Sequence, residues 1–175
     1  MTNPAPDQSI GVEPANRREA IAAAAIELLA LHGAWGLSHR AIDKSLHLPL
    51  GSTSYYFRTR QALLEVAENL VFERDMACML ETTDQSGDIQ GTQLIERWTA
   101  SSRRSTVLAR LELMLEASRN PALQAQMLTH RTKFLQRVKL ALAARGIVAD
   151  EAAVLASVAQ FEGALLQRLA FGHHQ

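Results

Sequence analysis

The segment 38–64, SHRAIDKSLHLPLGSTSYYFRTRQALL, decides the fold of this chain. Ser38 can cap the helix that follows, because its hydroxyl can accept a hydrogen bond from a free N–H group of the first turn. Pro49 and Gly51 mark a turn, and a very short segment rich in hydroxyl groups runs from there to Phe57. This order of helix, turn and short polar helix is typical of a helix-turn-helix that lays its second helix on a DNA duplex.

The short polar helix and its flanks carry side-chain types that contact DNA. Hydroxyl groups reach phosphate oxygens or base edges without bulk, and guanidinium groups bind phosphates. We expect Arg40, Ser52 and Thr53 nearest base edges, and Tyr55, Tyr56 and Arg60 at phosphates. The predicted DNA-binding residues are Ser38, Arg40, Leu50, Gly51, Ser52, Thr53, Tyr55, Tyr56, Arg58 and Arg60. A cluster of Ser, Thr and Tyr is also typical of a solvated loop, so this interpretation depends on the surrounding helices.

A preceding amphipathic helix is predicted over 17–33, RREAIAAAAIELLALHG, and it ends at Gly33. Its apolar stripe recurs at helical spacing through Ile21, Ala25, Leu28 and Leu29. Three helices of this kind make a small DNA-binding domain, which we place at 17–65.

A set of positions within 17–65 also matches a known DNA-binding family. The matching positions are Arg18, Ile21, Ala22, Ala23, Ala24, Gly33, Gly36, Leu37, Ser38, Ile42, the run 51–57, Arg60, Leu63 and Leu64. In these positions the segment resembles the N-terminal domain of the TetR family of transcriptional regulators. The resemblance implies a homodimeric repressor of a palindromic operator, released when a small-molecule inducer binds the C-terminal helices. The helix that begins at Arg60 would carry the movement, because it belongs to both domains.

Several positions depart from the usual pattern of that family. His47 stands where a glycine is favoured at the end of the second helix, and Asp43 stands where a small apolar residue is common. Histidine tolerates the left-handed conformation better than most residues, so we expect the turn to survive at a cost of about 1 kcal/mol. Ser54 and Tyr56 replace the usual Tyr and His, so the family's base contacts are not carried over there.

Composition sets broad limits on the function. The 175-residue chain has zero formal net charge, but 17–65 holds six Lys or Arg against four acids. DNA binding must therefore rely on placement and on two copies per operator. The single Cys78 excludes a disulfide within the chain and is consistent with a reducing cytosol. No apolar run is long enough to span a membrane, so a cytoplasmic location is expected. Residues 1–16, with three prolines and few apolar groups, are predicted to be a disordered arm.

The remainder, 66–175, is predicted to be a helical domain for ligand binding and dimerisation. Helices are expected at 60–80, 93–101, 106–118, 122–145 and 150–171, with a polar loop at 82–91. Since no β alternation is present, the predicted class is all-α. It comprises an N-terminal three-helix helix-turn-helix domain and a C-terminal helical bundle, about eight or nine helices in total.

The last predicted helix, 150–171, is apolar on more than one face. Such a helix must be buried on several sides, either as an ordinary core helix or against a second subunit. With the resemblance, we predict a dimer interface in which small residues such as Gly163 allow close approach. The predicted interface residues are Val154, Val158, Phe161, Leu165 and Leu169.

Large and adaptable side chains spread over the middle helices form the predicted inducer pocket. These residues are Phe72, Met76, Met79, Trp98, Met114, Met127, His130 and Phe134. A set of Met and aromatic residues at helical spacing is also typical of an ordinary core. The expected ligand is mostly apolar.

Enzyme motifs are lacking in the sequence. It contains no Glu-x-x-His pair for a di-iron bundle, no glycine-rich phosphate loop and no Cys/His metal spacing. We therefore expect no enzymatic activity, no metal site and no cofactor. Two alternatives remain, a helical small-molecule-binding protein and a bundle enzyme, each with a vestigial DNA-binding domain.

Overall fold

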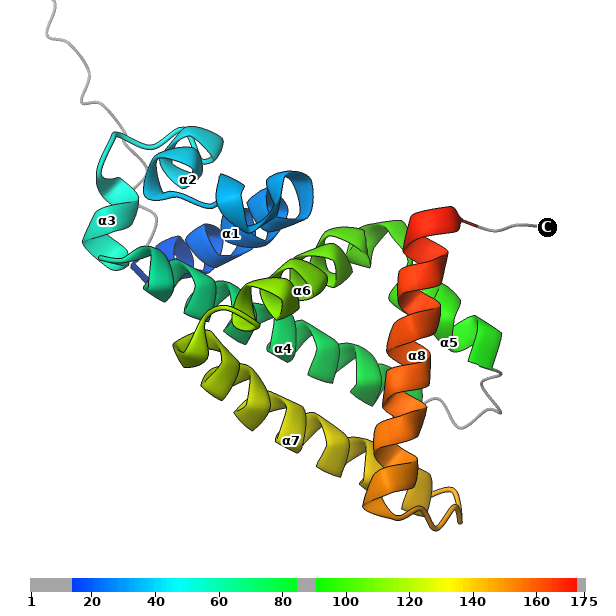
Figure 1. Ribbon diagram of the computed structural model, residues 1–175. Coiled ribbons are helices and arrows are strands. Elements are labelled where there is room, and N and C mark those ends of the chain that lie inside the picture. The colour runs from blue at the N-terminus through cyan, green and yellow to red at the C-terminus, as the bar shows by residue number, and fades with distance from the viewer. Residues whose placement is uncertain (1–13, 85–90, 173–175) are drawn as a thin grey trace, which may run out of the picture.

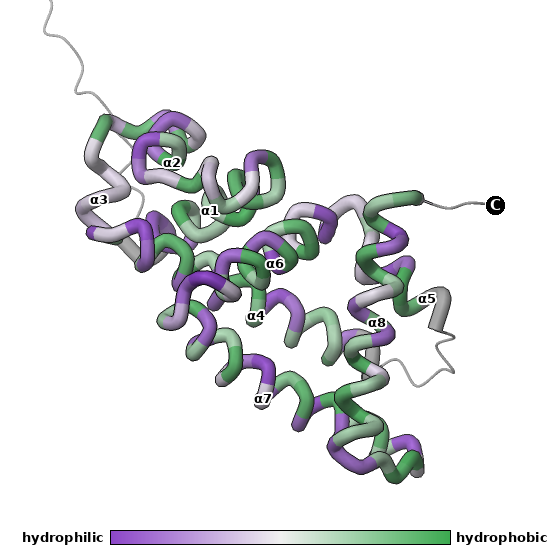
Figure 2. Tube along the Cα trace, viewed as in Figure 1, coloured by the Kyte–Doolittle hydropathy of each residue, from purple (hydrophilic) through white to green (hydrophobic). Residues whose placement is uncertain are grey.

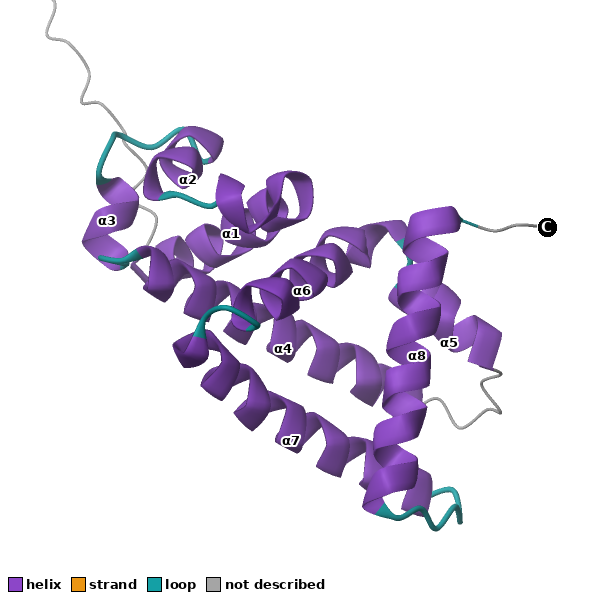
Figure 3. Ribbon diagram, viewed as in Figure 1, coloured by secondary structure: helices purple, strands orange, loops and turns teal. Residues whose placement is uncertain are grey.

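The computed structural model describes residues 14–84 and 91–172, and within these ranges it contains helices and no strand (Figures 1 and 3). Eight α-helices and one short 3-10 helix follow one another along the described chain. Their bounds are α1 Pro14–Gly36, α2 His39–Ser45, α3 Ser52–Tyr56, α4 Arg60–Asp84, α5 Gly91–Trp98, η1 Ser101–Arg103, α6 Arg104–Ala117, α7 Pro121–Ala143 and α8 Glu151–Phe171. The predicted all-α class and number of helices are confirmed.

Two predicted boundaries are corrected. Helix α1 begins at Pro14, so residues 14–16 are helical although they were predicted to belong to a disordered arm. The rest of that arm lies outside the described residues. Helix α4 continues to Asp84 and so includes the first residues of the predicted polar loop at 82–91. A proline fits the first turn of a helix, which accounts for the early start of α1.

Side-chain caps fix where several helices begin. The Ser38 hydroxyl accepts from the Ala41 N–H at 3.2 Å, as predicted for the start of α2. Asn120 caps α7, which has a proline in its first turn, and Asp150 caps α8. Each cap satisfies a backbone donor that the helix itself leaves free.

The path of α1 breaks at Gly33, where φ is 65° and ψ is −175°. Glycine has no Cβ and adopts this left-handed conformation without steric cost. The predicted end of the amphipathic helix at Gly33 is therefore confirmed as a kink, and a separate turn leads on to the buried Leu37.

One hydrophobic core extends from the N-terminal helices into the bundle. Buried residues of α1 and α4, such as Ile21, Leu29 and Leu63, pack in the same cluster as Leu113 of α6 and Leu123 of α7. Helix α6 lies alongside α1, and α4 runs from the N-terminal helices into the bundle (Figure 1). The predicted domain boundary after residue 65 thus falls inside a continuous helix. A second cluster, around Trp98, holds α5 and α8 in place.

Candidate DNA-binding surface and ligand cavity

The buried carboxylate of Asp43 positions the short helix α3. It accepts hydrogen bonds from the Gly51 N–H at 2.8 Å, the Thr53 N–H at 2.8 Å and the Thr53 hydroxyl at 2.6 Å. Burial pushes the pKa of Asp43 upward, but the hydrogen bonds from Thr53 and Gly51 outweigh this and hold that pKa below its usual value. Asp43 therefore caps α3 from the neighbouring helix, since Gly51, at the N-cap of α3, has no capping side chain.

The prediction that Thr53 lies near a base edge is wrong. Its side chain is fully buried, and its hydroxyl donates to Asp43. A five-residue helix held against a core must turn one side inward, and Thr53 occupies that side. The neighbouring Ser54 and Tyr55 are exposed, Tyr55 to 82%.

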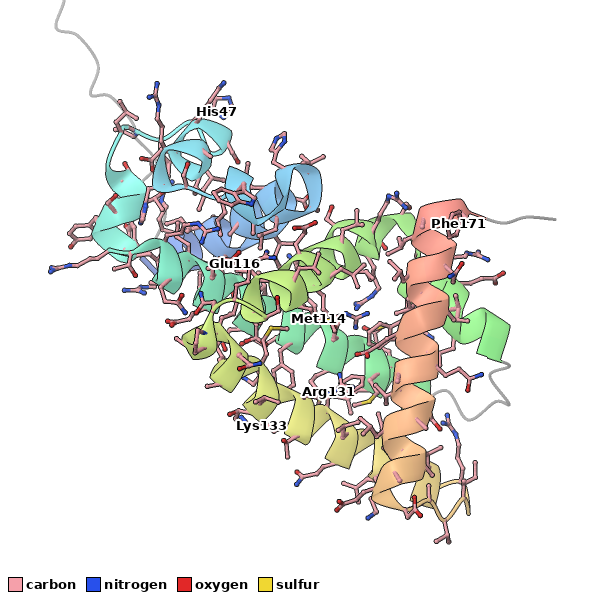
Figure 4. All side chains as sticks on the ribbon, in the orientation of Figure 1. His47, Met114, Glu116, Arg131, Lys133 and Phe171 are labelled. Atoms are coloured by element: carbon pink, nitrogen blue, oxygen red, sulfur yellow. The ribbon has the colours of Figure 1, made fainter. Side chains whose placement is uncertain are left out.

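Most of the other predicted DNA-binding residues share the exposed surface of α2, the turn and α3. Ser38, Arg40, Leu50, Gly51, Tyr55 and Arg58 are exposed, and Ser52 and Tyr56 are partly exposed. His47 lies at the tip of this surface (Figure 4) with φ of 54°, which confirms the left-handed turn residue. Lys44, four residues after Arg40, is exposed as well and was missed. Its i, i+4 spacing from Arg40 was the available signal.

Arg60, predicted to contact a phosphate, instead binds within the chain. Its guanidinium donates to Glu116 Oε1 at 2.9 Å and to the carbonyl oxygen of Ala34. Ala34 in turn donates its N–H to Glu112 Oε2 at 3.3 Å. Arg60 therefore ties the start of α4 to α6 and to the segment after the kink at Gly33. Its partners lie far away in sequence, so spacing could not reveal them.

A cavity of about 290 Å³ lies between α4, α6, α7 and α8. Five of the predicted pocket residues line it, namely Phe72, Met114, Met127, His130 and Phe134. Met114 of α6 and Arg131 of α7 lie on its two sides (Figure 4). Met79 and Trp98 line a smaller, apolar cavity of about 200 Å³ that shares Phe134. Met76 lines neither cavity and packs on the second core cluster.

Two buried carboxylates in the wall of the larger cavity were missed by sequence reasoning. Glu68 and Asp75 lie on α4, four residues before and three after Phe72, so all three share one helical face. The Asp75 carboxylate accepts from Arg103 at 2.8 Å and from Arg110 at 3.1 Å. Burial raises the pKa of Asp75, and the two guanidinium groups oppose that rise.

Trp98 is a core residue and does not line the larger cavity. Only 2% of it is exposed, because the guanidinium groups of Arg103 and Arg110 cover its ring at 5.0 and 5.5 Å from the centroid. The ring of Phe161 meets it edge to face at 5.3 Å. Residue type alone could not distinguish this core position from a ligand contact.

Glu68 pairs with His130 in the wall of the larger cavity. His130 Nδ1 lies 2.8 Å from Glu68 Oε2, and the amide of Gln126 donates to the same oxygen. The imidazole stacks on Phe72, with the ring centroids 4.1 Å apart and the planes inclined by 4°. A carboxylate and a flat aromatic surface therefore stand side by side.

Comparisons with known proteins agree with this arrangement. Residues 91–175 match the family described as "Tetracyclin repressor-like, C-terminal domain". A member of the TetR family from Streptomyces coelicolor is 32% identical, with 87% of each chain covered and a TM-score of 0.69. This chain belongs to the TetR family. It is accordingly a DNA-binding transcriptional regulator.

Other solved structures share the same fold. The multidrug binding protein EbrR, in its complex with ethidium, is 31% identical with a TM-score of 0.66, and 92% of this chain and 91% of EbrR are covered. A transcriptional regulator from Rhodococcus sp. is 18% identical with a TM-score of 0.74, over 88% and 84% of the two chains, and shows the fold alone. No curated protein matches the chain.

The residues predicted for the dimer interface of this TetR-family chain face its own interior. Val154, Val158 and Leu165 are buried within the chain. Phe161 and Leu169 are partly buried against the cluster around Trp98. The prediction is corrected because periodicity assigns residues to one face without saying which neighbour covers it. The opposite face of α8 carries the exposed residues Leu155, Ala159, Gly163 and Leu166. Figure 2 shows hydrophobic positions along this helix.

The same described ranges contain no helix long and apolar enough to cross a membrane. They also contain no group of three His, Cys, Asp or Glu residues that could hold a metal ion. The expected lack of cofactors stays a prediction.

Proposed function

We propose that this TetR-family regulator is a homodimeric repressor of a palindromic operator, and that a mostly apolar small molecule in the larger cavity releases it from DNA. The observation that carries the proposal is the position of α6. One side of this helix lines the cavity, and the other side is hydrogen-bonded to the N-terminal helices.

Helix α6 can couple the cavity to the DNA-binding surface. Leu113 and Met114 line the cavity, while Glu112 and Glu116 hold Ala34 and Arg60. A ligand that moves α6 would pull on the segment after Gly33, which leads into α2. A tenfold loss of operator affinity requires only about 1.4 kcal/mol of differential binding between the two arrangements.

The relatives support a ligand of moderate size with aromatic rings. EbrR has been solved in complexes with ethidium and with malachite green. In this chain Phe72, Met114, Met127 and Phe134 supply apolar and aromatic walls of the type that holds such molecules.

The exposed face of α8 supports a dimer. Leu155 and Leu166 are 46% and 49% exposed, and nothing lies within 4 Å of a side-chain carbon built at Gly163. A second copy would cover this face. It would also bring the α3 helices of the two copies to successive half-sites, about 34–36 Å apart. We also place the regulator in the cytoplasm, where its operator would be, and propose no catalytic role.

Binding to the DNA that flanks the coding region tests the proposal. We expect an inverted repeat there to be bound in a salt-dependent way by the full chain and released by malachite green. Met114→Trp should fill the cavity and prevent release while leaving operator binding intact. The same dye added to DNA alone is the control. Ligand binding without sequence-specific DNA binding would favour a small-molecule carrier, and turnover of the bound molecule would favour a bundle enzyme.

A further inference from the structure

Glu68 is a buried carboxylate in the cavity wall whose partners carry no fixed positive charge. Its side chain is 5% exposed. Within the described part of the chain it is bonded to the imidazole of His130 and the amide of Gln126. A buried carboxylate is costly unless it is paired, and an imidazole supplies a full counter-charge only when it is protonated.

The other carboxylates that line this cavity already have permanent cations. Asp75 is held between two arginines, Arg103 and Arg110. Glu162 of α8 pairs with Arg131 at 3.1 Å. Among the cavity carboxylates of the described residues, Glu68 is therefore the one without an arginine partner, so its charge is the one that a cationic ligand can pair with.

The surface beside Glu68 is flat and aromatic. The stacked rings of Phe72 and His130 adjoin the carboxylate, and Phe134 and Met127 line the same cavity. Aromatic faces attract cations as well as planar rings. A flat aromatic cation would satisfy both features, because its rings can stack while its charge faces the carboxylate.

We propose that Glu68 and His130 form the recognition site for a flat aromatic monocation, and that a proton on His130 competes with this cation. The proposal rests on the proposed function, in which this cavity is the inducer site. With neutral His130 the pair carries one negative charge and attracts the ligand. A proton on His130 neutralises the pair and places a positive charge beside the ligand.

Ligand entry is therefore linked to proton release from His130 into the solvent. The other charged groups around the pair come from all the helices that enclose the cavity, and they are Asp75 of α4, Arg110 of α6, Arg131 of α7 and Glu162 of α8. They are bound to one another or to Arg103, whereas the imidazole of His130 is bound to the one cavity carboxylate of the described residues that has no arginine partner.

Direct binding of three ring systems of one shape to the full chain, without DNA, tests the proposal. N-methylacridinium keeps its positive charge at every pH, 9-(hydroxymethyl)anthracene is neutral, and anthracene-9-carboxylate is negative. At about pH 8 we expect the cation to bind at least about tenfold more tightly than the neutral compound. This preference should be smaller when binding is measured at about pH 5 instead of about pH 8, because protonation of an imidazole beside Glu68 places a positive charge next to the ligand. Calorimetry in two buffers should detect the released proton.

Three variants test which side chains cause the preference for the cation and its pH dependence. Glu68→Gln should remove the preference for the cation and keep binding of the neutral compound. His130→Gln should keep the preference, since an amide can still donate to Glu68, and should remove its pH dependence. Glu73→Gln makes the same charge change at an exposed position of α4 and should alter nothing. Circular dichroism checks that each variant is folded. If Glu68→Gln does not fold, His130→Gln still tests the proposal.

Equal binding of the cation and the neutral compound would overturn the proposal, as would a pH dependence that persists in His130→Gln. Failure of all three compounds to bind would overturn it too. The inducer role is judged separately, by release of the operator. Release by the neutral compound, unchanged in Glu68→Gln, would leave the inducer role standing and refute the charge recognition. A cation that binds through Glu68 without releasing DNA would leave the charge recognition standing and refute the inducer role.

Discussion

Two buried carboxylates in this regulator, one at the candidate DNA-binding surface and one in the cavity wall, are satisfied in different ways. Asp43 receives three hydrogen bonds, two of them from backbone N–H groups that cannot move without moving α3. Glu68 receives its bonds from the side chains of His130 and Gln126, which can turn away. Helix α3 is thus held in one position, whereas Glu68 in the cavity wall can exchange its side-chain partners for a ligand.

Removing the first carboxylate should have the largest effect. Asp43→Ala leaves three donors at the start of α3 without a partner, so we expect the free energy of unfolding to fall by at least about 3 kcal/mol. Operator binding should be lost with it. Urea denaturation followed by tryptophan fluorescence measures the change. Glu73→Ala, which removes an exposed carboxylate from α4, is the control. A loss below about 1 kcal/mol would show that α3 is held by other contacts.

A second substitution tests whether dimerisation through α8 is needed to place the α3 helices of two copies on the operator. Gly163→Trp places a large ring on the exposed face of α8, and we expect monomers in sedimentation experiments because overpacking disrupts a close interface. Operator affinity should fall about a hundredfold, since the second half-site no longer binds as part of one molecule. Ser102→Trp, at an exposed position of η1, is the matched control. A monomeric variant with normal affinity for the full operator would disprove the dimer requirement.

Substitution of two arginines distinguishes contact with DNA from the coupling between the cavity and the N-terminal helices. Arg40→Ala should weaken operator binding several-fold and flatten its salt dependence by about one unit, because it removes an exposed positive charge from the candidate DNA-binding surface. Arg60→Ala should leave that slope unchanged and reduce ligand-induced release, because it cuts the link to Glu116 and Ala34. Fluorescence anisotropy at several salt concentrations distinguishes the two outcomes. A flatter salt dependence of operator binding in Arg60→Ala would show that Arg60 contacts DNA.

The smallest effect concerns acid stability. The pKa of Asp43 in the folded protein lies below its usual value, so the ionised carboxylate stabilises the fold above about pH 4 and this contribution is lost as the pH falls through the lowered pKa. Asp43→Asn should therefore be less stable near neutrality and should lose less stability in acid. Denaturation midpoints between about pH 2 and pH 6 measure this difference. Parallel pH profiles for the two proteins would contradict it.

Local signals in the sequence predicted the elements that depend on local chemistry. Ser38 as a cap, Gly33 as the end of a helix and His47 in a left-handed turn all follow from the preferences of single residues. Thr53 was misplaced because a five-residue helix is too short for periodicity to show which side faces inward. Arg60 was misplaced because its partner Glu116 lies 56 residues away.

Apolar periodicity also predicted the outline of the helical bundle. Apolar periodicity grouped Val154, Val158 and Leu165 on one face of α8, and they do share a face. It could not tell whether a second subunit or the chain's own α5 and α7 would cover that face. Five pocket residues were found from their types, whereas Glu68 and Asp75 were missed because acidic residues on a helix are most often solvated.

The core that joins α1 and α4 to α6 and α7 limits how this regulator can be recombined. Ile21 and Leu29 pack in one cluster with Leu113 and Leu123, so the N-terminal helices are not a detachable module. A fragment that ends near residue 65 would expose an apolar surface and should aggregate. A chimera that grafts this DNA specificity onto another ligand-binding domain must carry over the facing side of α6 as well.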